Sequence, residues 1–453
     1  MPLSLFAANA LTPEGWQRDV RIDVDARGTI TVVRPNARAD GAEHVQGPLI
    51  PGMPNLHSHA FQRAIAGRTG RAGIEGDSFW TWRAAMYAFL ERVDADAFAA
   101  IAKQAYVEML RAGYTRVAEF HYVHHDPNGK PYDDPAELAR RIVAAATTTG
   151  IALTLLPVFY AHAGFGGAPP AGAQRRFVHS LDSYARVVEA LANDAARANW
   201  NLGVAPHSLR AVTPDELGAI VTLVPQGAPI HIHAAEQQKE VADCVAWSGA
   251  RPIAWLLDHV RVDSRWCVVH ATHMTADETR GLAASEAVAG LAPTTEADLG
   301  DGTFGARDYL DAGGTFGVGS DSNTIVDPYA ELRQLEWSQR LVQQSRNVLA
   351  IAEVPVGQSL YVAAARGGAQ AAGIAAGAIA PGCRADLVVL DTTGAALAEQ
   401  DIDTMLDAAI FGPCRKPVRD VMVGGRWIVR DGHHANEEAI LRRYRGTIAK
   451  LRQ

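Results

Sequence analysis

Short apolar runs of strand length alternate with helical stretches over the middle of the chain, from about residue 49 to about residue 330. This alternation is typical of parallel strands joined by helices, and eight such cycles favour a closed (β/α)8 barrel. A doubly wound open sheet also alternates, but no Gly-x-Gly-x-x-Gly turn follows a strand here. We therefore expect a TIM-like α/β barrel, with one strand that ends near His57 and others over residues 116–120, 151–159, 202–206, 229–233, 266–270, 287–291 and 314–319.

Helical periodicity separates most of these strands. Several helices open with a capping signal, such as Thr213 before Pro214, or Thr275 ahead of Asp277 and Glu278. The expected helices cover residues 96–111, 135–146, 181–196, 214–224, 240–257 and 276–283.

The two ends of the chain have a different pattern, with short strands separated by turn residues. Near the N-terminus the strands are expected over residues 3–8, 20–24 and 29–33, and near the C-terminus over 387–390, 418–423 and 426–429, the last two joined by a Gly-Gly hairpin turn. Both ends together predict a small β-sandwich domain beside the barrel. The predicted limits are 1–48 and 376–435 for the β-sandwich, 49–375 for the barrel and 436–453 for a C-terminal helix.

Composition narrows the class of partner and the compartment. The 453 residues carry a formal net charge of -8, without a lysine or arginine cluster, which gives no reason to expect nucleic acid and indicates a small-molecule partner. Four cysteines without a Cys-x-x-Cys pair fit a reducing cytoplasm. Residues 142–174 contain no Asp, Glu, Lys or Arg, but threonines, prolines and glycines interrupt them, so we expect no membrane span and a cytoplasmic protein.

Unusual polar residues fall where the predicted barrel strands end, which is where barrels carry their reactive groups. His57 and His59 end the first strand, and side chains two apart on a strand project from one face. His233 ends the fifth strand, His270 ends the sixth, and Asp321 follows the eighth. We expect these groups to meet around one metal ion.

Three imidazoles and a carboxylate suit Zn²⁺ with a position open for water, whose pKa the metal lowers from about 16 toward about 7. A metal-dependent hydrolase follows from this chemistry. His231 has the same strand parity as His233, which lies nearer the strand's end and is preferred as the ligand. Glu236, three residues further on, is either a general acid and base or a helix-start carboxylate, and the pattern alone leaves both open.

These residues resemble the amidohydrolase superfamily, with His-x-His after the first strand, histidines on the fifth and sixth, and aspartate after the eighth. The fourth strand ends in Ala205, Pro206 and His207 without a lysine, as in the mononuclear deaminase branch. The segments 51–67, 205–210, 231–236 and 319–323 are more closely similar to the N-formimino-L-glutamate deiminases of histidine degradation, and the resemblance extends over the whole chain, including residues 382–391, which resemble the superfamily's return strand.

The resemblance implies zinc-dependent hydrolysis of N-formimino-L-glutamate to N-formyl-L-glutamate and ammonia, by a homodimer with one Zn²⁺ per chain, a site that Fe²⁺ or Mn²⁺ would also fit. It implies as metal ligands His57, His59, His233 and Asp321. As catalytic groups it implies Glu236, His270 and Asp321, with the division of proton transfers between Glu236 and Asp321 left open. For the substrate pocket it implies Gln62, Arg83, Tyr122, His207 and Arg210.

The pocket residues suit a dicarboxylate, because arginine pairs bidentately with carboxylates. Arg83 is expected in a loop after the first strand, with Trp80 and Trp82 as loop packing, and Arg210 just after the fourth strand. Each arginine could instead be a solvated helix charge. The competing functions are another mononuclear aminohydrolase, of the guanine, adenosine or chlorotriazine type, and a noncatalytic assembly protein that kept the fold.

Overall fold

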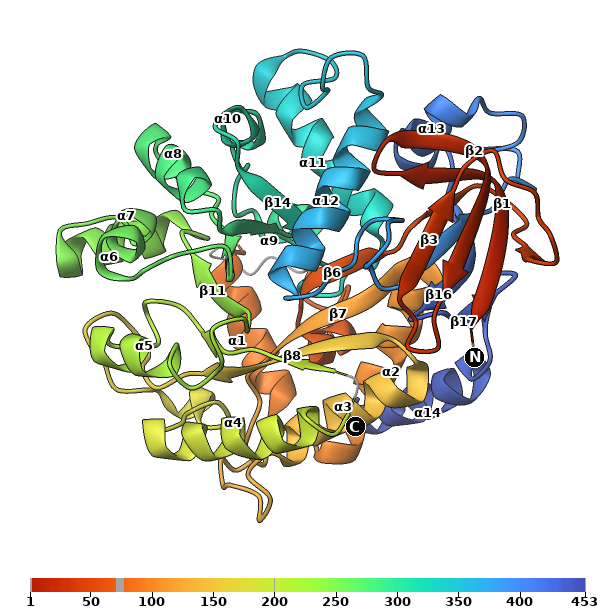
Figure 1. The fold of residues 1–453 in the computed structure, drawn as a ribbon. Helices are drawn as coiled ribbons and strands as arrows, with labels where there is room; N and C mark the ends of the chain where they lie inside the picture. The colour runs from red at the N-terminus through yellow and green to blue at the C-terminus, as the bar shows by residue number, and fades with distance from the viewer. Residues whose placement is uncertain (1, 71–76, 199, 453) are drawn as a thin grey trace.

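The computed structural model describes residues 2–70, 77–198 and 200–452. Parallel strands run through the middle of the molecule with helices around them, and a sheet built from both chain ends lies beside them (Figure 1). The α/β class, with a barrel and a smaller β-rich part, is confirmed.

The barrel wall consists of two sets of parallel strands, β6-β7-β8-β10 with β9 beside β8, and β11-β12-β13-β14. Isolated parallel bridges join the sets at both edges and so close the barrel: Val204 with Ile230 and Ser208 with His233 at one edge, and Ser58 with Asp321 at the other. Two short segments, β9 and β10, share the fourth position. The strands are β6 (Met53–Ser58), β7 (Tyr114–His121), β8 (Ala152–Phe159), β9 (Asn201–Leu202), β10 (Ala205–Pro206), β11 (Ile230–Ala234), β12 (Trp266–His270), β13 (Val288–Leu291) and β14 (Thr315–Val318).

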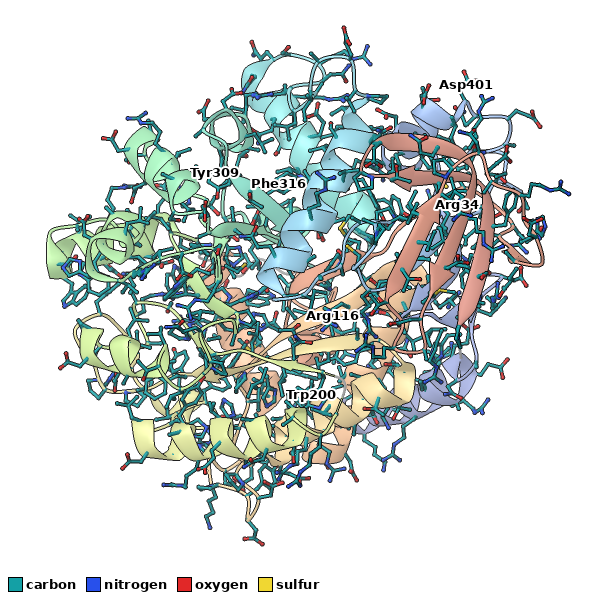
Figure 2. The ribbon with its side chains drawn as sticks, in the orientation of Figure 1. Arg34, Arg116, Trp200, Tyr309, Phe316 and Asp401 are labelled. Atoms are coloured by element: carbon teal, nitrogen blue, oxygen red, sulfur yellow. The ribbon has the colours of Figure 1, made fainter. Side chains whose placement is uncertain are left out.

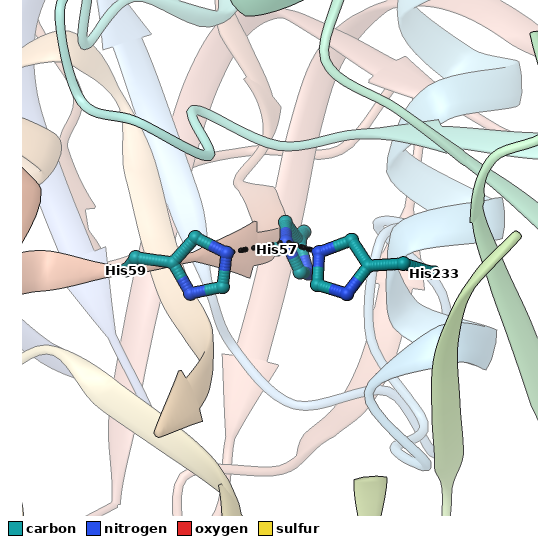
Figure 3. Close-up of side chains that lie close together, drawn as sticks. All are labelled: His57, His59 and His233. Atoms are coloured by element: carbon teal, nitrogen blue, oxygen red, sulfur yellow. Dashed lines mark hydrogen bonds between the residues drawn. The ribbon is translucent and has the colours of Figure 1, made fainter. Parts of the chain in front are cut away.

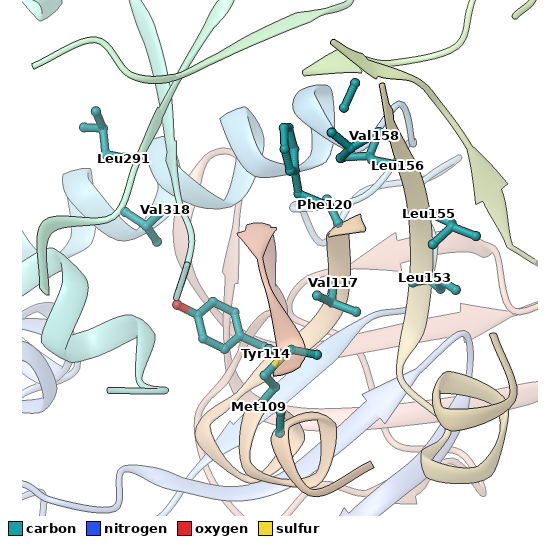
Figure 4. Packing of buried hydrophobic residues seen from close by; sticks show 14 of the residues in the cluster. Met109, Tyr114, Val117, Phe120, Leu153, Leu155, Leu156, Val158, Leu291 and Val318 are labelled. Carbon is teal, nitrogen blue, oxygen red and sulfur yellow. The ribbon is translucent and has the colours of Figure 1, made fainter. Parts of the chain in front are cut away.

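The barrel strands are apolar along most of their length because both of their faces are covered. Every residue of β7 and β8 is buried. Figure 4 shows Val117 and Phe120 of β7 near Leu153, Leu155, Leu156 and Val158 of β8, in the same core as Leu291 and Val318. Helices over one face and the barrel interior on the other explain why these strands read as continuous hydrophobic runs.

Helices follow the barrel strands in the predicted order, and the two predicted caps are present. The side chains of Thr213 and Thr275 accept from the backbone N–H groups of Glu216 and Glu278, in two capping boxes. The helices that follow strands are α2 (Ala95–Ala112), α3 (Glu137–Thr149), α4 (Leu181–Ala195), α5 (Pro214–Ile220), α6 (Gln238–Ser248), α7 (Pro252–His259), α8 (Ala276–Ala284), α9 (Pro293–Leu299), α10 (Ala306–Asp311), α11 (Pro328–Gln343) and α12 (Val356–Ala371), with short 3-10 turns η1 (Ala60–Ala64) and η2 (Gly172–Gln174).

Two expectations about helices are wrong. The single helix predicted over residues 240–257 is two, α6 and α7, because Gly249 ends the first with a positive φ of 77° and Pro252 begins the second. The loop predicted around Arg83 is helix α1 (Phe79–Leu90), which has a capping box between Ser78 and Thr81. Apolar residues lie on its exposed side too, at Ala84, Ala85 and Ala88, so its apolar pattern is not that of an ordinary amphipathic helix.

The strands of both chain ends hydrogen-bond into one sheet of order β18-β17-β16-β15-β5-β1-β2-β3, with β4 beside β1. Gly424 and Gly425 form the predicted hairpin turn, and both have the positive φ that a type I′ turn requires. The elements are β1 (Leu3–Thr12), β2 (Gly15–Val24), β3 (Ile30–Arg34), β4 (Glu43–His44), β5 (Leu49–Pro51), β15 (Leu387–Leu390), β16 (Val418–Val423), β17 (Arg426–Arg430) and β18 (His433–His434), followed by α14 (Glu437–Leu451), with η3 (Ile402–Thr404) and α13 (Met405–Phe411) between β15 and β16.

One segment runs from the sheet straight into the barrel. Strand β5 pairs with β1 and β15, and after the single residue Gly52 the chain continues as β6, which pairs with β7. A Cβ atom at Gly52 would lie 2.3 Å from the side chain of Thr115, so only glycine fits at this crossing. The first strand of the barrel is therefore fixed directly to the sheet.

Side chains fill the barrel and its contact with the sheet (Figure 2). Arg116, on β7, is buried there and donates from Nη1 to the carbonyl oxygen of Leu153 at 2.8 Å. Among the described residues, no helix is long and apolar enough to cross a membrane.

Candidate metal centre and active site

Three histidines converge at the ends of β6 and β11. The Nε2 atom of His57 lies 3.2 Å from Nε2 of His59 and 3.1 Å from Nε2 of His233 (Figure 3). All three side chains are buried. Among the described residues, these three histidines form the one group of at least three possible ligands whose donor atoms lie close enough together to hold a metal ion.

The protonation of these rings fits a metal ion. The Nδ1–H of His59 donates to the carbonyl oxygen of Phe120, and that of His233 to the carbonyl oxygen of His207, each at 3.0 Å. Because a carbonyl oxygen only accepts, the Nε2 atoms are left as bare lone pairs that face each other. Nitrogen ligands about 2 Å from a tetrahedral zinc ion stand about 3.3 Å apart, which the observed separations match.

Asp321 adds a carboxylate beside these rings. Its Oδ1 lies 3.4 Å from Nε2 of His57 and 3.3 Å from Nε2 of His59. Burial lowers the pKa of His57 to about 3. Burial alone would raise the pKa of Asp321, but the neighbouring His57 and His59 hold it below its ordinary value. Neutral imidazoles and an ionised carboxylate are the forms that bind a metal.

A buried amide network holds the first and eighth strands together behind these ligands. Asn323 Nδ2 donates to the carbonyl oxygens of His59 and Asp321, at 3.0 and 2.9 Å. The Asn55 side chain donates to Ser320 Oγ at 2.6 Å, and the Ser320 hydroxyl donates to Asn323 Oδ1 at 2.7 Å. The backbone that carries His59 and Asp321 is thereby fixed before any ion binds.

The carboxyl ends of the strands also carry strained backbone. Non-glycine residues with positive φ occur there at Ala235 (55°), His270 (69°), Ala271 (50°), Asp321 (41°) and Asn323 (55°). Such residues cost about 1–3 kcal/mol each and persist where the surrounding structure holds them. This clustering is typical of a functional site.

His270 lies between carboxylates. Its Nε2 is 3.7 Å from Oε1 of Glu236 and 3.9 Å from Oδ2 of Asp321, and its Nδ1 is 3.3 Å from Oε1 of Glu296. Burial alone would lower the pKa of His270, but Glu236, Glu296 and Asp321 together raise it to about 10. Burial also raises the pKa of Glu236, against the opposing effect of His270 and Arg210. An imidazole and a carboxyl group, both with raised pKa values, thus stand side by side.

Arg210 supplies a second positive group. Its Nη2 lies 3.9 Å from Oε2 of Glu236, and its Nε is buried without a hydrogen-bond partner among the described residues. Burial would lower the pKa of Arg210, but Glu240 and Glu236 raise it. A largely buried guanidinium with an unpaired donor is suited to bind an anionic ligand.

The remaining predicted pocket residues line one cavity with the groups above. Gln62 Nε2 donates to the hydroxyl of Tyr122 at 2.9 Å, and the Nδ1 of His207 lies 3.0 Å from Ser208 Oγ. Arg83 reaches the cavity from α1, with its guanidinium 4.5 Å from the centre of the Trp80 ring. The cavity is lined by His59, Gln62, Phe79, Trp82, Arg83, Met86, Tyr87, Tyr122, Tyr160, Phe177, His207, Arg210, His233, Glu236, His270, Leu299 and Asp321.

Comparison with known proteins decides the family. The sequence model of the amidohydrolase family matches residues 49–428, and a model described as the N-terminal domain of formimidoylglutamate deiminase HutF matches residues 4–47. The chain belongs to the amidohydrolase family.

Relatives of this amidohydrolase include a formimidoylglutamate deiminase of Pseudomonas aeruginosa, 51% identical over 99% of both chains. Among solved structures, an amidohydrolase from Brucella melitensis has a TM-score of 0.95 at 47% identity and covers 100% of both chains. An adenosine deaminase from Xanthomonas campestris, with bound zinc, has a TM-score of 0.83 at 23% identity, with 99% of this chain and 98% of that chain covered. The second structure supports the fold alone.

The alternative histidine, His231, lies outside the metal cluster of this amidohydrolase. It is buried on β11, and its Nε2 lies 2.7 Å from the carbonyl oxygen of Ala371 on α12. The two histidines of the strand therefore face different groups, although their parity is the same.

Several neighbours of the site could not be found from local sequence. Glu240 accepts from the backbone N–H groups of Ala235 (3.2 Å) and Glu236 (3.1 Å), and Glu296 contacts His270 from α9. Tyr160 follows β8 into the cavity. The only local signal was for Glu240, whose position four residues after Glu236 allows a helix-start carboxylate to bind that backbone.

Proposed function

We propose that this amidohydrolase hydrolyses the formimino group of N-formimino-L-glutamate, giving N-formyl-L-glutamate and ammonia in histidine degradation. The observation that carries the proposal is that Arg210, whose buried Nε has no hydrogen-bond partner among the described residues, lies close to Glu236 and the three-histidine cluster. The 51% identity to the Pseudomonas aeruginosa formimidoylglutamate deiminase supports the same substrate.

His57, His59, His233 and Asp321 would hold the ion, for which we propose Zn²⁺. A divalent ion at that place supplies a nucleophile at neutral pH by lowering the pKa of water. One water is consumed: its oxygen bonds to the formimino carbon, the bond from that carbon to the terminal nitrogen breaks, and the nitrogen leaves as ammonia.

The side chains divide the remaining work. Glu236 carries a proton to the departing nitrogen, since burial favours its protonated form. His270 stabilises charge on the reacting amidine through its Nε2–H, and Asp321 orients the attacking water. Arg210 and Arg83, which both line the cavity, bind the two carboxylates of the glutamate part.

The experiment that tests the function is a steady-state assay of ammonia release, with N-formimino-L-glutamate compared with guanine, adenosine and a chlorotriazine. We expect turnover of the formimino compound at a kcat/KM at least about 100-fold above that of the ring compounds, because the two arginines that line the cavity suit carboxylates. Preferential deamination of a purine would overturn the proposal.

Removal of the metal gives a further prediction. Metal analysis should find about one zinc ion per chain, and dialysis against a chelator should abolish ammonia release. Addition of Zn²⁺ should restore it. Full activity after the chelator has removed all metal would contradict a metal-dependent reaction.

Arg210→Met tests how the substrate is held. Loss of a charge-assisted pair leaves one carboxylate poorly matched, so KM for N-formimino-L-glutamate should rise roughly 10- to 100-fold. Arg186→Met, on the exposed side of α4, is the matched control and should leave KM unchanged. An unchanged KM in Arg210→Met would refute the carboxylate contact.

A further inference from the structure

Glu296 lies on the Nδ1 side of His270, opposite the Nε2 atom that faces Glu236 and Asp321, and the reaction steps proposed above do not use it. We propose that Glu296 is a positioning residue, which fixes the His270 ring so that its Nε2–H faces the reacting amidine. The inference rests on the proposed function, because it concerns the same site.

The contacts of His270 give the ring one orientation. Nδ1 lies 3.3 Å from Oε1 of Glu296, whereas Nε2, at the opposite end of the ring, lies 3.7 Å from Glu236 and 3.9 Å from Asp321. A flip of the ring would turn a C–H group toward the Glu296 carboxylate. Since an ionised carboxylate only accepts, Nδ1 carries a proton in the observed orientation.

Glu296 is itself held rigidly. It is 4% exposed, and its Oε1 also accepts from the backbone N–H of Ala292 at 3.0 Å. Thr294, on the same helix, is fixed by Glu331. The Glu331 carboxylate accepts from the backbone N–H of Thr294 at 2.8 Å and from the Thr294 hydroxyl at 2.6 Å. The carboxylate is therefore aimed at His270 without any rearrangement.

A purely structural role does not account for this arrangement. An uncharged side chain could accept from the Ala292 N–H, whereas a buried carboxylate is costly unless something gains from its charge. The only basic group within hydrogen-bond reach of Glu296, among the described residues, is the imidazole of His270. A group that orients a catalytic histidine by hydrogen-bonding its far nitrogen changes kcat more than it changes binding.

A double-mutant cycle separates positioning from stability. Glu296→Gln keeps an acceptor for both N–H groups but removes the charge, and we expect kcat to fall roughly 10- to 100-fold with KM changed less than about threefold. In the His270→Asn background, Glu296→Gln should cause no further loss, because its effect passes through the ring. If the fall in kcat of the double variant equals the product of the falls in the two single variants, the inference is overturned and Glu296 is a structural residue.

The matched control is Glu331→Gln, a buried carboxylate that holds the same helix but does not contact His270. It should keep kcat within about threefold of the unaltered enzyme, even if the melting temperature falls. An equal fall in kcat for Glu331→Gln and Glu296→Gln would show that a less rigid α9 is sufficient to lower kcat, and this would contradict the positioning role of Glu296.

A measurement without turnover keeps this inference separate from the proposed function. In ¹⁵N-histidine-labelled protein, the Nδ1 resonance of His270 can be assigned because it is absent from the spectrum of His270→Asn. This resonance should shift in Glu296→Gln and should keep its position in Glu331→Gln. An unshifted resonance would overturn the positioning role whatever the substrate. If the unaltered enzyme releases no ammonia from N-formimino-L-glutamate, the proposed function fails, and the labelled spectra still decide the role of Glu296.

Discussion

Glu236→Gln is expected to retain the metal and bind N-formimino-L-glutamate with near-normal affinity, while kcat falls roughly 100- to 10,000-fold. The amide has the shape of the carboxyl group but cannot accept and release a proton. Its neighbours His270, at 3.7 Å, and Arg210, at 3.9 Å, stay in place to hold the substrate. Ammonia release at saturating substrate, with metal content measured on the same sample, checks this.

The control for this variant is Glu189→Gln, which alters an exposed carboxylate on α4 and should leave kcat unchanged. A near-native rate for Glu236→Gln would remove Glu236 from proton transfer. A loss of zinc in that variant would instead assign Glu236 to metal binding.

Replacement of His233 by alanine should remove the metal and, with it, at least about 1,000-fold of the activity, because one of three convergent imidazoles is lost. Zinc per chain, measured after dialysis against a weak chelator, should fall to near zero. His231→Gln is the matched variant two residues earlier on the same strand. A glutamine there can still donate to the carbonyl oxygen of Ala371, so zinc content should stay at the level of the unaltered enzyme.

The opposite result would relocate the metal. If His231→Gln lost zinc while His233→Ala kept it, the cluster of His57, His59 and His233 would not be the binding site. A fall in melting temperature without loss of zinc is the expected effect of His231→Gln, since this residue only ties β11 to α12.

The barrel was predictable from sequence because its strands are covered on both faces and so read as unbroken apolar runs. β12, over Trp266–His270, has the predicted limits, and α14, over Glu437–Leu451, is the predicted C-terminal helix. Helix α1 was missed because apolar residues such as Ala84, Ala85 and Ala88 lie on its exposed side, which weakens the periodicity of an amphipathic helix. The transfer of β5 to the sheet could not be foreseen, since strand partners are not local.

The site was predictable to the extent that it depends on strand ends. His57, His59 and His233 meet because parallel strands present their carboxyl ends to one rim of the barrel. Glu296 belongs to a helix 26 residues beyond His270, and only the closed barrel brings the two together. The choice between His231 and His233 depends on a contact with α12, which begins more than 100 residues later along the chain.

The sheet shared by both chain ends has a consequence for biosynthesis. Strand β5, which leads into His57 and His59, pairs with β15. It therefore cannot complete its pairing until residue 390 has been synthesised and has left the ribosome. Until then the nascent protein has an open strand edge that invites association with other unfinished polypeptides. Chaperone demand should therefore peak late in translation, and a chain stopped before residue 387 should be degraded even though all the proposed zinc-binding side chains are already made.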